Sequence, residues 1–235
     1  MYKLLAIFSL PLLLAGLSGC GGGGGGGGAP AGPVTSTLSF PLQSAENTFV
    51  ANGVTKTFTV AGTCSGTGSM SVAPAATGAT FEGAAALSMV QTITISYTNC
   101  TPASIASTAT SYFNSSYVQL GLNIPGSVYG VFLVPPIIPT SVTVGGTGIV
   151  GTLTLYTDST KAIGSGRLDL SYVIEPDTST TAIVNKIIKT YNAAGTLTQT
   201  AQGRARIAMV GATTPISLDT QAANGSTTHL VWTFN

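Results

Sequence analysis

Two carboxylates stand close together in the stretch EPDTST, at Glu175 and Asp177. Paired carboxylates can serve as acid and base in glycoside hydrolysis, and their oxygens are ligands that Ca²⁺ prefers. The stretch lacks the regular D-x-D-x-D-G spacing of a calcium loop. A turn in which Asp177 bonds its own backbone explains the same residues, and we favour it. Glu175 and Asp177 therefore remain candidate ligand-binding residues, with glycan hydrolysis as an alternative function.

Aromatic residues gather in the hydroxyl-rich stretch SYFNSSYVQL, at Tyr112, Phe113 and Tyr117. Tyrosines in a polar setting can stack on sugar rings or contact a protein partner. The same rings can also fill the core of a β domain, which is the interpretation we favour. Tyr112 and Tyr117 are kept as candidate ligand-binding residues of a carbohydrate-binding module.

Other patterns argue against cofactor and nucleic-acid chemistry. Residues 146–151, GTGIVG, fit G-x-G-x-x-G, but the strand-like TLTLYT follows where a dinucleotide site needs a helix. The segment is expected to be a glycine-rich connection. His229 is the sole histidine and has Asp219 as its nearest acidic residue, so no zinc site and no marked catalytic residue are expected. With 8 Lys and Arg against 7 Asp and Glu, no nucleic-acid footprint is present.

Two of the three cysteines, Cys64 and Cys100, are predicted to form a disulfide in an exported protein. Such a bridge would close a loop of about 37 residues and stabilise the fold by roughly 3–4 kcal/mol on the chain-entropy model. The alternative is a reactive thiol at Cys64, because GTCSG imitates a nucleophile elbow. That elbow needs a following helix, and TGSMSVAPAATG is not helical.

The third cysteine follows a stretch with the order of an export signal, MYKLLAIFSLPLLLAGLS. Its apolar run of about 11 residues is shorter than the roughly 20 that a membrane-spanning helix needs. The sequence LSGC, ending at Cys20, resembles the bacterial lipobox. This resemblance implies that residues 1–19 are removed and that Cys20 carries covalent lipid, a diacylglyceryl group and further acyl chains. By resemblance to enterobacterial lipoproteins, Gly21 in place of aspartate implies the outer membrane.

Residues 20–33 form the lipidated cysteine and a Gly-rich tether, whose thirteen residues after Cys20 span about 20 Å on average. Similar glycine runs occur in surface lipoproteins of Gram-negative bacteria. The body, with stretches such as TNCTPAS and GVFLVPP, resembles exported lipoproteins of beta-proteobacterial type, and this resemblance implies no activity. Surface exposure and a periplasm-facing body both stay open.

Apolar and polar residues alternate through residues 34–235, as in QTITISYT, GRLDLSYVI and HLVWTFN. Shorter strands are expected at residues 38–42 and 141–144, a turn at NAAG, residues 192–195, and a hairpin at Asn224-Gly225. No sustained helical pattern is present. We predict an all-β antiparallel β-sandwich of about ten strands, with an up-and-down β-barrel in the C-terminal half as the alternative. One β domain is favoured over two subdomains that split near residues 125–140.

The sequence thus predicts a non-enzymatic outer-membrane lipoprotein whose tethered β domain serves in binding or envelope structure. The alternatives are the glycan hydrolase and the carbohydrate-binding module described above. Expected partners are the outer-membrane lipid and an unidentified glycan or protein. No nucleotide, nucleic acid, metal or cofactor is expected, apart from the lipid on Cys20.

Overall fold

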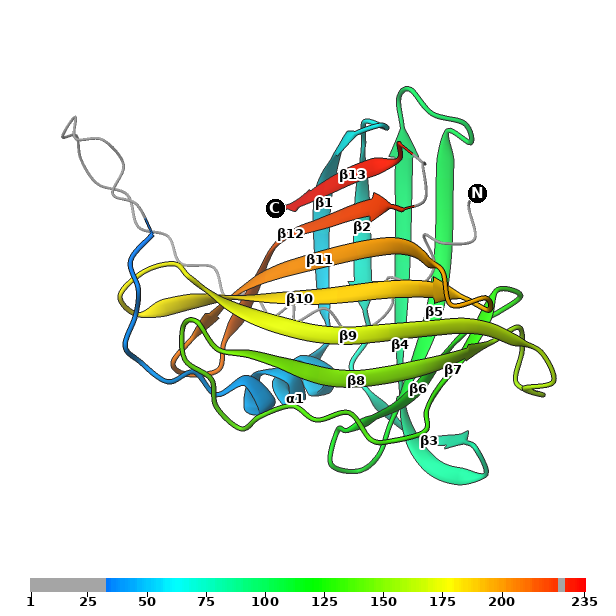
Figure 1. The fold of residues 1–235 in the computed structure, drawn as a ribbon, viewed down its shortest axis with the longest axis horizontal. Coiled ribbons are helices and arrows are strands. Elements are labelled where there is room, and N and C mark those ends of the chain that lie inside the picture. Colours follow the sequence, from blue (N-terminus) through cyan, green and yellow to red (C-terminus); the bar gives the residue numbers. More distant parts are fainter. Residues whose placement is uncertain (1–32, 224–226) are drawn as a thin grey trace.

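A computed structural model describes residues 33–223 and 227–235. Their strands form one 13-stranded antiparallel sheet in which most neighbours in space are neighbours in sequence (Figure 1). The elements are α1 (Leu42–Asn52), β1 (Val54–Gly62), β2 (Gly66–Val72), β3 (Ala76–Phe81), β4 (Ala84–Tyr97), β5 (Ser104–Phe113), β6 (Gln119–Ile124), β7 (Val128–Phe132), β8 (Thr147–Tyr156), β9 (Gly164–Pro176), β10 (Thr181–Asn192), β11 (Leu197–Ala208), β12 (Thr213–Ala222) and β13 (His229–Phe234).

The sheet closes on itself because β1 pairs with β13 and β2 pairs with both β1 and β4. Twelve strands thereby form a closed β-barrel, and β3 remains outside it, paired with β4. In Figure 1, β9–β11 cross in front of β2, β4 and β5 at a steep angle. The expected sandwich is not confirmed. The alternative barrel fits, and it takes in strands on both sides of residues 125–140.

The expected alternation places apolar side chains inside the barrel. On β9 the buried side chains are Leu168, Leu170, Tyr172 and Ile174, as GRLDLSYVI predicts. At the opposite wall Trp232 stacks on Phe58, with ring centroids 4.7 Å apart. Each such large side chain contributes roughly 1.5–3 kcal/mol when it leaves water. The interior is therefore a packed apolar core.

The helix α1 is a departure from the expected all-strand fold. Its buried residues follow the i, i+3, i+4 spacing of one helix face: Leu42, Ala45, Glu46, Phe49 and Val50. The stripe is only three turns long and contains a glutamate, so the sequence shows no sustained helical pattern over twelve residues. Residues 38–42 were expected as a strand, but only Phe40 makes an isolated bridge, to Val142. The helix stops at Gly53, whose φ of 64° lies in the left-handed region.

The connection between β7 and β8 also differs from expectation. The strand expected at residues 141–144 is reduced to the bridge at Val142. Residues 146–151 are not merely a connection, because β8 begins at Thr147 and has a bulge between Ile149 and Gly151. On its β8 side, the short strand β7 reaches only residues 153–156, which form the second half of β8. Beside the first half of β8 runs the segment LVPPIIP, residues 133–139, which we call the proline strap.

The predicted disulfide is confirmed. Cys64 in the β1–β2 turn is bonded to Cys100 in the β4–β5 turn, and their Cα atoms are 5.7 Å apart. The bridge therefore fixes two neighbouring turns at one end of the barrel. The turn expected at residues 192–195 joins β10 to β11. Asn224-Gly225, Cys20, the signal segment and most of the tether lie outside the described residues.

Candidate ligand-binding site

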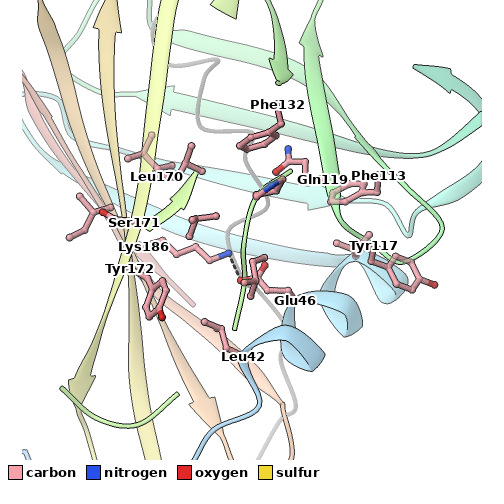
Figure 2. A pocket seen from close by; sticks show the side chains of 16 residues that line it. Leu42, Glu46, Phe113, Tyr117, Gln119, Phe132, Leu170, Ser171, Tyr172 and Lys186 are labelled. Atoms are coloured by element: carbon pink, nitrogen blue, oxygen red, sulfur yellow. Dashed lines mark ion pairs between the residues drawn. The ribbon is translucent and has the colours of Figure 1, made fainter. Parts of the chain in front are cut away.

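A pocket lies inside the barrel between α1 and the inner face of β5–β10 (Figure 2). Its cavity volume is about 50 Å³. Leu42, Glu46 and Val50 line it from α1, and Pro136 and Ile138 line it from the proline strap. The strands contribute mostly apolar side chains, including Phe113, Phe132, Val150, Leu170 and Ile188. The pocket is therefore an apolar chamber with few polar groups.

An ion pair between Lys186 and Glu46 crosses this chamber. Lys186 occupies an inward position of β10, in the same phase as Val184 and Ile188. Glu46 lies on the buried stripe of α1, with a side chain only 6% exposed. Burial raises the pKa of Glu46, and the opposing effect of the Lys186 ammonium is smaller. The pair ties the helix to the strand wall.

Gln119 is the second polar feature of the pocket. It begins β6 beside Phe113, its register partner on β5, and Figure 2 shows it near Phe113 and Phe132. The residue is 8% exposed, and its side-chain nitrogen has no hydrogen-bond partner within the described chain. A buried donor without a partner costs about 1–3 kcal/mol. An acceptor oxygen on a bound molecule would remove that cost.

Tyr117, one of the sequence-predicted residues, also lines the pocket. Its backbone has a φ of 61°, and its N–H donates to the carbonyl of Asn114 in the turn between β5 and β6. Non-glycine residues in this left-handed region are uncommon and concentrate at functional sites. Tyr112 lies elsewhere, stacked on Phe81 of β3 with centroids 4.6 Å apart, in a separate cluster outside the barrel. The two tyrosines therefore do not form one platform.

Glu175 and Asp177 do not line the pocket. Glu175 pairs with Arg204 at 3.1 Å, and Asp177 pairs with Arg206 at 2.6 Å. These neighbouring arginines come from β11, opposite in phase to the buried Ala205 and Ile207. The hydrogen bond from Arg206, together with one from Thr181, lowers the pKa of Asp177 despite partial burial. Both carboxylates thus belong to ion pairs on the outer wall.

His229 and Asp219 are brought together, as their positions on successive strands suggest. The His229 Nε2 atom lies 2.9 Å from Asp219 Oδ1, and both side chains are partly exposed. Within residues 33–223 and 227–235, no group of three or more His, Cys, Asp or Glu residues could hold a metal ion.

Three polar residues that line the pocket, Glu46, Lys186 and Gln119, were not among the site residues predicted from the sequence. A signal did exist for Lys186, because it interrupts the apolar phase of the stretch TAIVNKIIKTY. A charged residue at an inward strand position needs a partner in the interior. Glu46 is likewise a charged residue among the apolar residues of the buried stripe on α1. Gln119 carries no such signal, since its burial depends on the turn before it.

No protein-family model matches the chain, and no curated protein or solved structure matches it either. In the part of the chain that the structure describes, no helix is long and apolar enough to cross a membrane.

Proposed function

We propose that this protein is an outer-membrane lipoprotein whose β-barrel binds a small amphipathic molecule in the pocket beside α1. The observation that carries this proposal is Gln119, whose buried side-chain nitrogen has no hydrogen-bond partner within the described chain and lies in an apolar chamber. Most buried polar groups in proteins are hydrogen-bonded, and exceptions call for an explanation. A ligand oxygen beside Gln119 supplies one.

The pocket defines the chemical class of the ligand. Apolar side chains around it favour a hydrocarbon body, and Gln119 favours a carbonyl or carboxyl oxygen. A cavity of 50 Å³ has room for roughly four water molecules, since each water needs about 10–15 Å³ of such volume. The ligand is therefore a short apolar acid, ester or aldehyde, or the end of a longer chain. Lys186 and Glu46 set the polarity of the chamber beside it.

The envelope location rests on the sequence, namely the export signal and the lipobox resemblance that ends at Cys20. Binding is favoured over glycan hydrolysis because Glu175 and Asp177 each pair with an arginine outside the pocket. Such neutralised carboxylates are poorly suited to the acid and base roles that hydrolysis requires.

Titration calorimetry of the full-length protein with short-chain carboxylic acids and their methyl esters tests the proposal. Gln119→Leu is expected to weaken binding roughly tenfold, the loss of one hydrogen bond. The matched control is Gln91→Leu, because Gln91 is also buried and its side-chain oxygen has no partner within the described chain, but it does not line the pocket. Val150→Phe, which adds volume at the pocket wall, should abolish binding. Equal binding by all variants would contradict the proposal.

A further inference from the structure

The outer surface of the proline strap and the adjoining start of β8 carry an apolar patch, which we define as Leu133, Val134, Ile137 and Ile149. These side chains are 69%, 72%, 70% and 81% exposed. The strap lies against β8, because the N–H of Ile137 donates to the carbonyl of Val150 at 2.8 Å. Ile138 and Val150 line the pocket, whereas Ile137 and Ile149 are exposed. The patch and the pocket are therefore separated by one layer of chain.

The patch is a concentration of exposed apolar residues along the proline strap and the first half of β8. It holds four of the nine large apolar residues that are exposed in the described part of the chain. Nearby on β9, the outward residue Asp169 pairs with Arg167 at 3.2 Å and accepts a hydrogen bond from Thr152. The charges of Arg167 and Asp169 therefore cancel at the edge of the patch. Any surface that covers the patch is bound through apolar contact rather than through net charge.

The end of the predicted tether lies on the same wall of the barrel as the patch. Val34, the first residue after the predicted tether, bridges to Asp177 directly after β9. Ile149 pairs in register with Ser171 of β9, which lies six residues before Asp177 in the sequence. At about 3.3 Å per residue, the tether therefore ends about 20 Å from the patch. The tether itself is expected to span about 20 Å on average, so Cys20 can reach as far from Val34 as the patch lies.

We propose that the apolar patch rests on the bilayer that holds the lipid of Cys20. This inference rests on the lipid anchor of the proposed function, and not on the identity of the pocket ligand. The anchor keeps the body within reach of the membrane, and the patch supplies the contact that orients it. Apolar groups at such a surface enter the boundary between headgroups and acyl chains, about 5–10 Å deep. In this orientation the layer formed by the proline strap and β8 separates the pocket from the bilayer.

A tryptophan placed in the patch tests this orientation in the full-length lipidated protein. Ile149→Trp is reconstituted into vesicles of phosphatidylethanolamine and phosphatidylglycerol with brominated chains, which quench indole fluorescence on contact. The native Trp232 is 1% exposed inside the barrel, so its emission is a constant background. The matched control is Thr59→Trp, an exposed position on β1, across the barrel from β8.

We expect the Ile149→Trp protein to lose most of its added emission, at low and high salt alike, and the Thr59→Trp protein to keep it. Ile137→Trp provides a second reporter if Ile149→Trp does not fold. Equal quenching at patch and control positions, or quenching at neither, would overturn the docking. Mass spectrometry of the same samples separates the two proposals. A lipidated protein without patch quenching refutes the docking alone, whereas an unmodified Cys20 refutes the anchor and the docking together.

Discussion

Lys186 of β10 and Glu46 of α1 form an ion pair inside the barrel, between elements that are far apart in the sequence. Their side chains are 19% and 6% exposed, so water screens the pair only weakly. The pair joins the helix to the strand wall at the pocket. Removing one partner would leave the other charge in an apolar chamber, which is the costly way to break such a pair.

Lys186→Met is expected to destabilise the protein at neutral pH by about 3 kcal/mol, because ionised Glu46 would stay buried without its partner. Burial raises the pKa of Glu46 above that of the unfolded chain. The folded state therefore holds this proton more tightly, and stability falls as the pH rises through the raised pKa. In acid, Glu46 is protonated and the loss should vanish. Urea unfolding across pH measures this.

The control for that series is Lys189→Met, which removes an exposed lysine from the outer face of the same strand. Its effect should be small and independent of the protonation of Glu46. If the loss of unfolding free energy caused by Lys186→Met is the same in acid as at neutral pH, ionised Glu46 is not the cause of that loss.

The double variant Glu46→Leu with Lys186→Met should be at least as stable as the native protein. Well-packed apolar residues often replace a buried ion pair without loss, because neither charge is then desolvated. Differential scanning calorimetry of the two single variants and the double variant gives the comparison. A double variant less stable than the native protein would contradict this and show that the ion pair contributes net stability.

The disulfide should contribute roughly 3–4 kcal/mol, because it closes a long loop between the β1–β2 and β4–β5 turns. The double variant Cys64→Ala with Cys100→Ala is expected to unfold at correspondingly lower urea concentration. The single variant Cys20→Ala serves as the control, since it removes a cysteine without removing this bridge. Identical midpoints for all three proteins would contradict the expectation.

On the outer wall, Arg206→Met should raise the pKa of Asp177 toward its ordinary value. The hydrogen bond from Arg206 is the largest cause of the lowered pKa. The stabilisation by this pair is present above the ordinary carboxyl range and is lost as the pH falls through the lowered pKa. Because Arg206 is half exposed, the gain is below about 1 kcal/mol. Carboxyl NMR titration should show the shift in Arg206→Met and not in Arg204→Met.

Strand positions and their inward faces could be predicted from the sequence because alternation directly reflects burial of one sheet face. Leu168 and Leu230 are buried as their patterns indicate. The same patterns do not say what a face is buried against. Closure of the barrel depends on the pairing of β1 with β13 and of β2 with β4. These are long-range contacts, and a sandwich would bury the same residues.

The pocket was harder to predict because it depends on the short helix α1. The stripe on α1 spans three turns and includes Glu46, so neither its length nor its composition identifies a helix in isolation. Lys186 could have been recognised from its inward phase on β10. Gln119 could not, since its burial results from the turn that carries Tyr117 and from the packing of Phe113.

The most direct test of the ligand site is the side-chain amide signal of Gln119 in ¹H–¹⁵N NMR spectra, followed while a methyl ester of a short-chain acid is added to the full-length protein. Bound ester should shift the Gln119 amide signals in step with the calorimetric binding curve and leave those of Gln91 in place. An ester that binds without moving the Gln119 signals, or that moves those of Gln91 as much, would contradict a site in which Gln119 donates to the ligand.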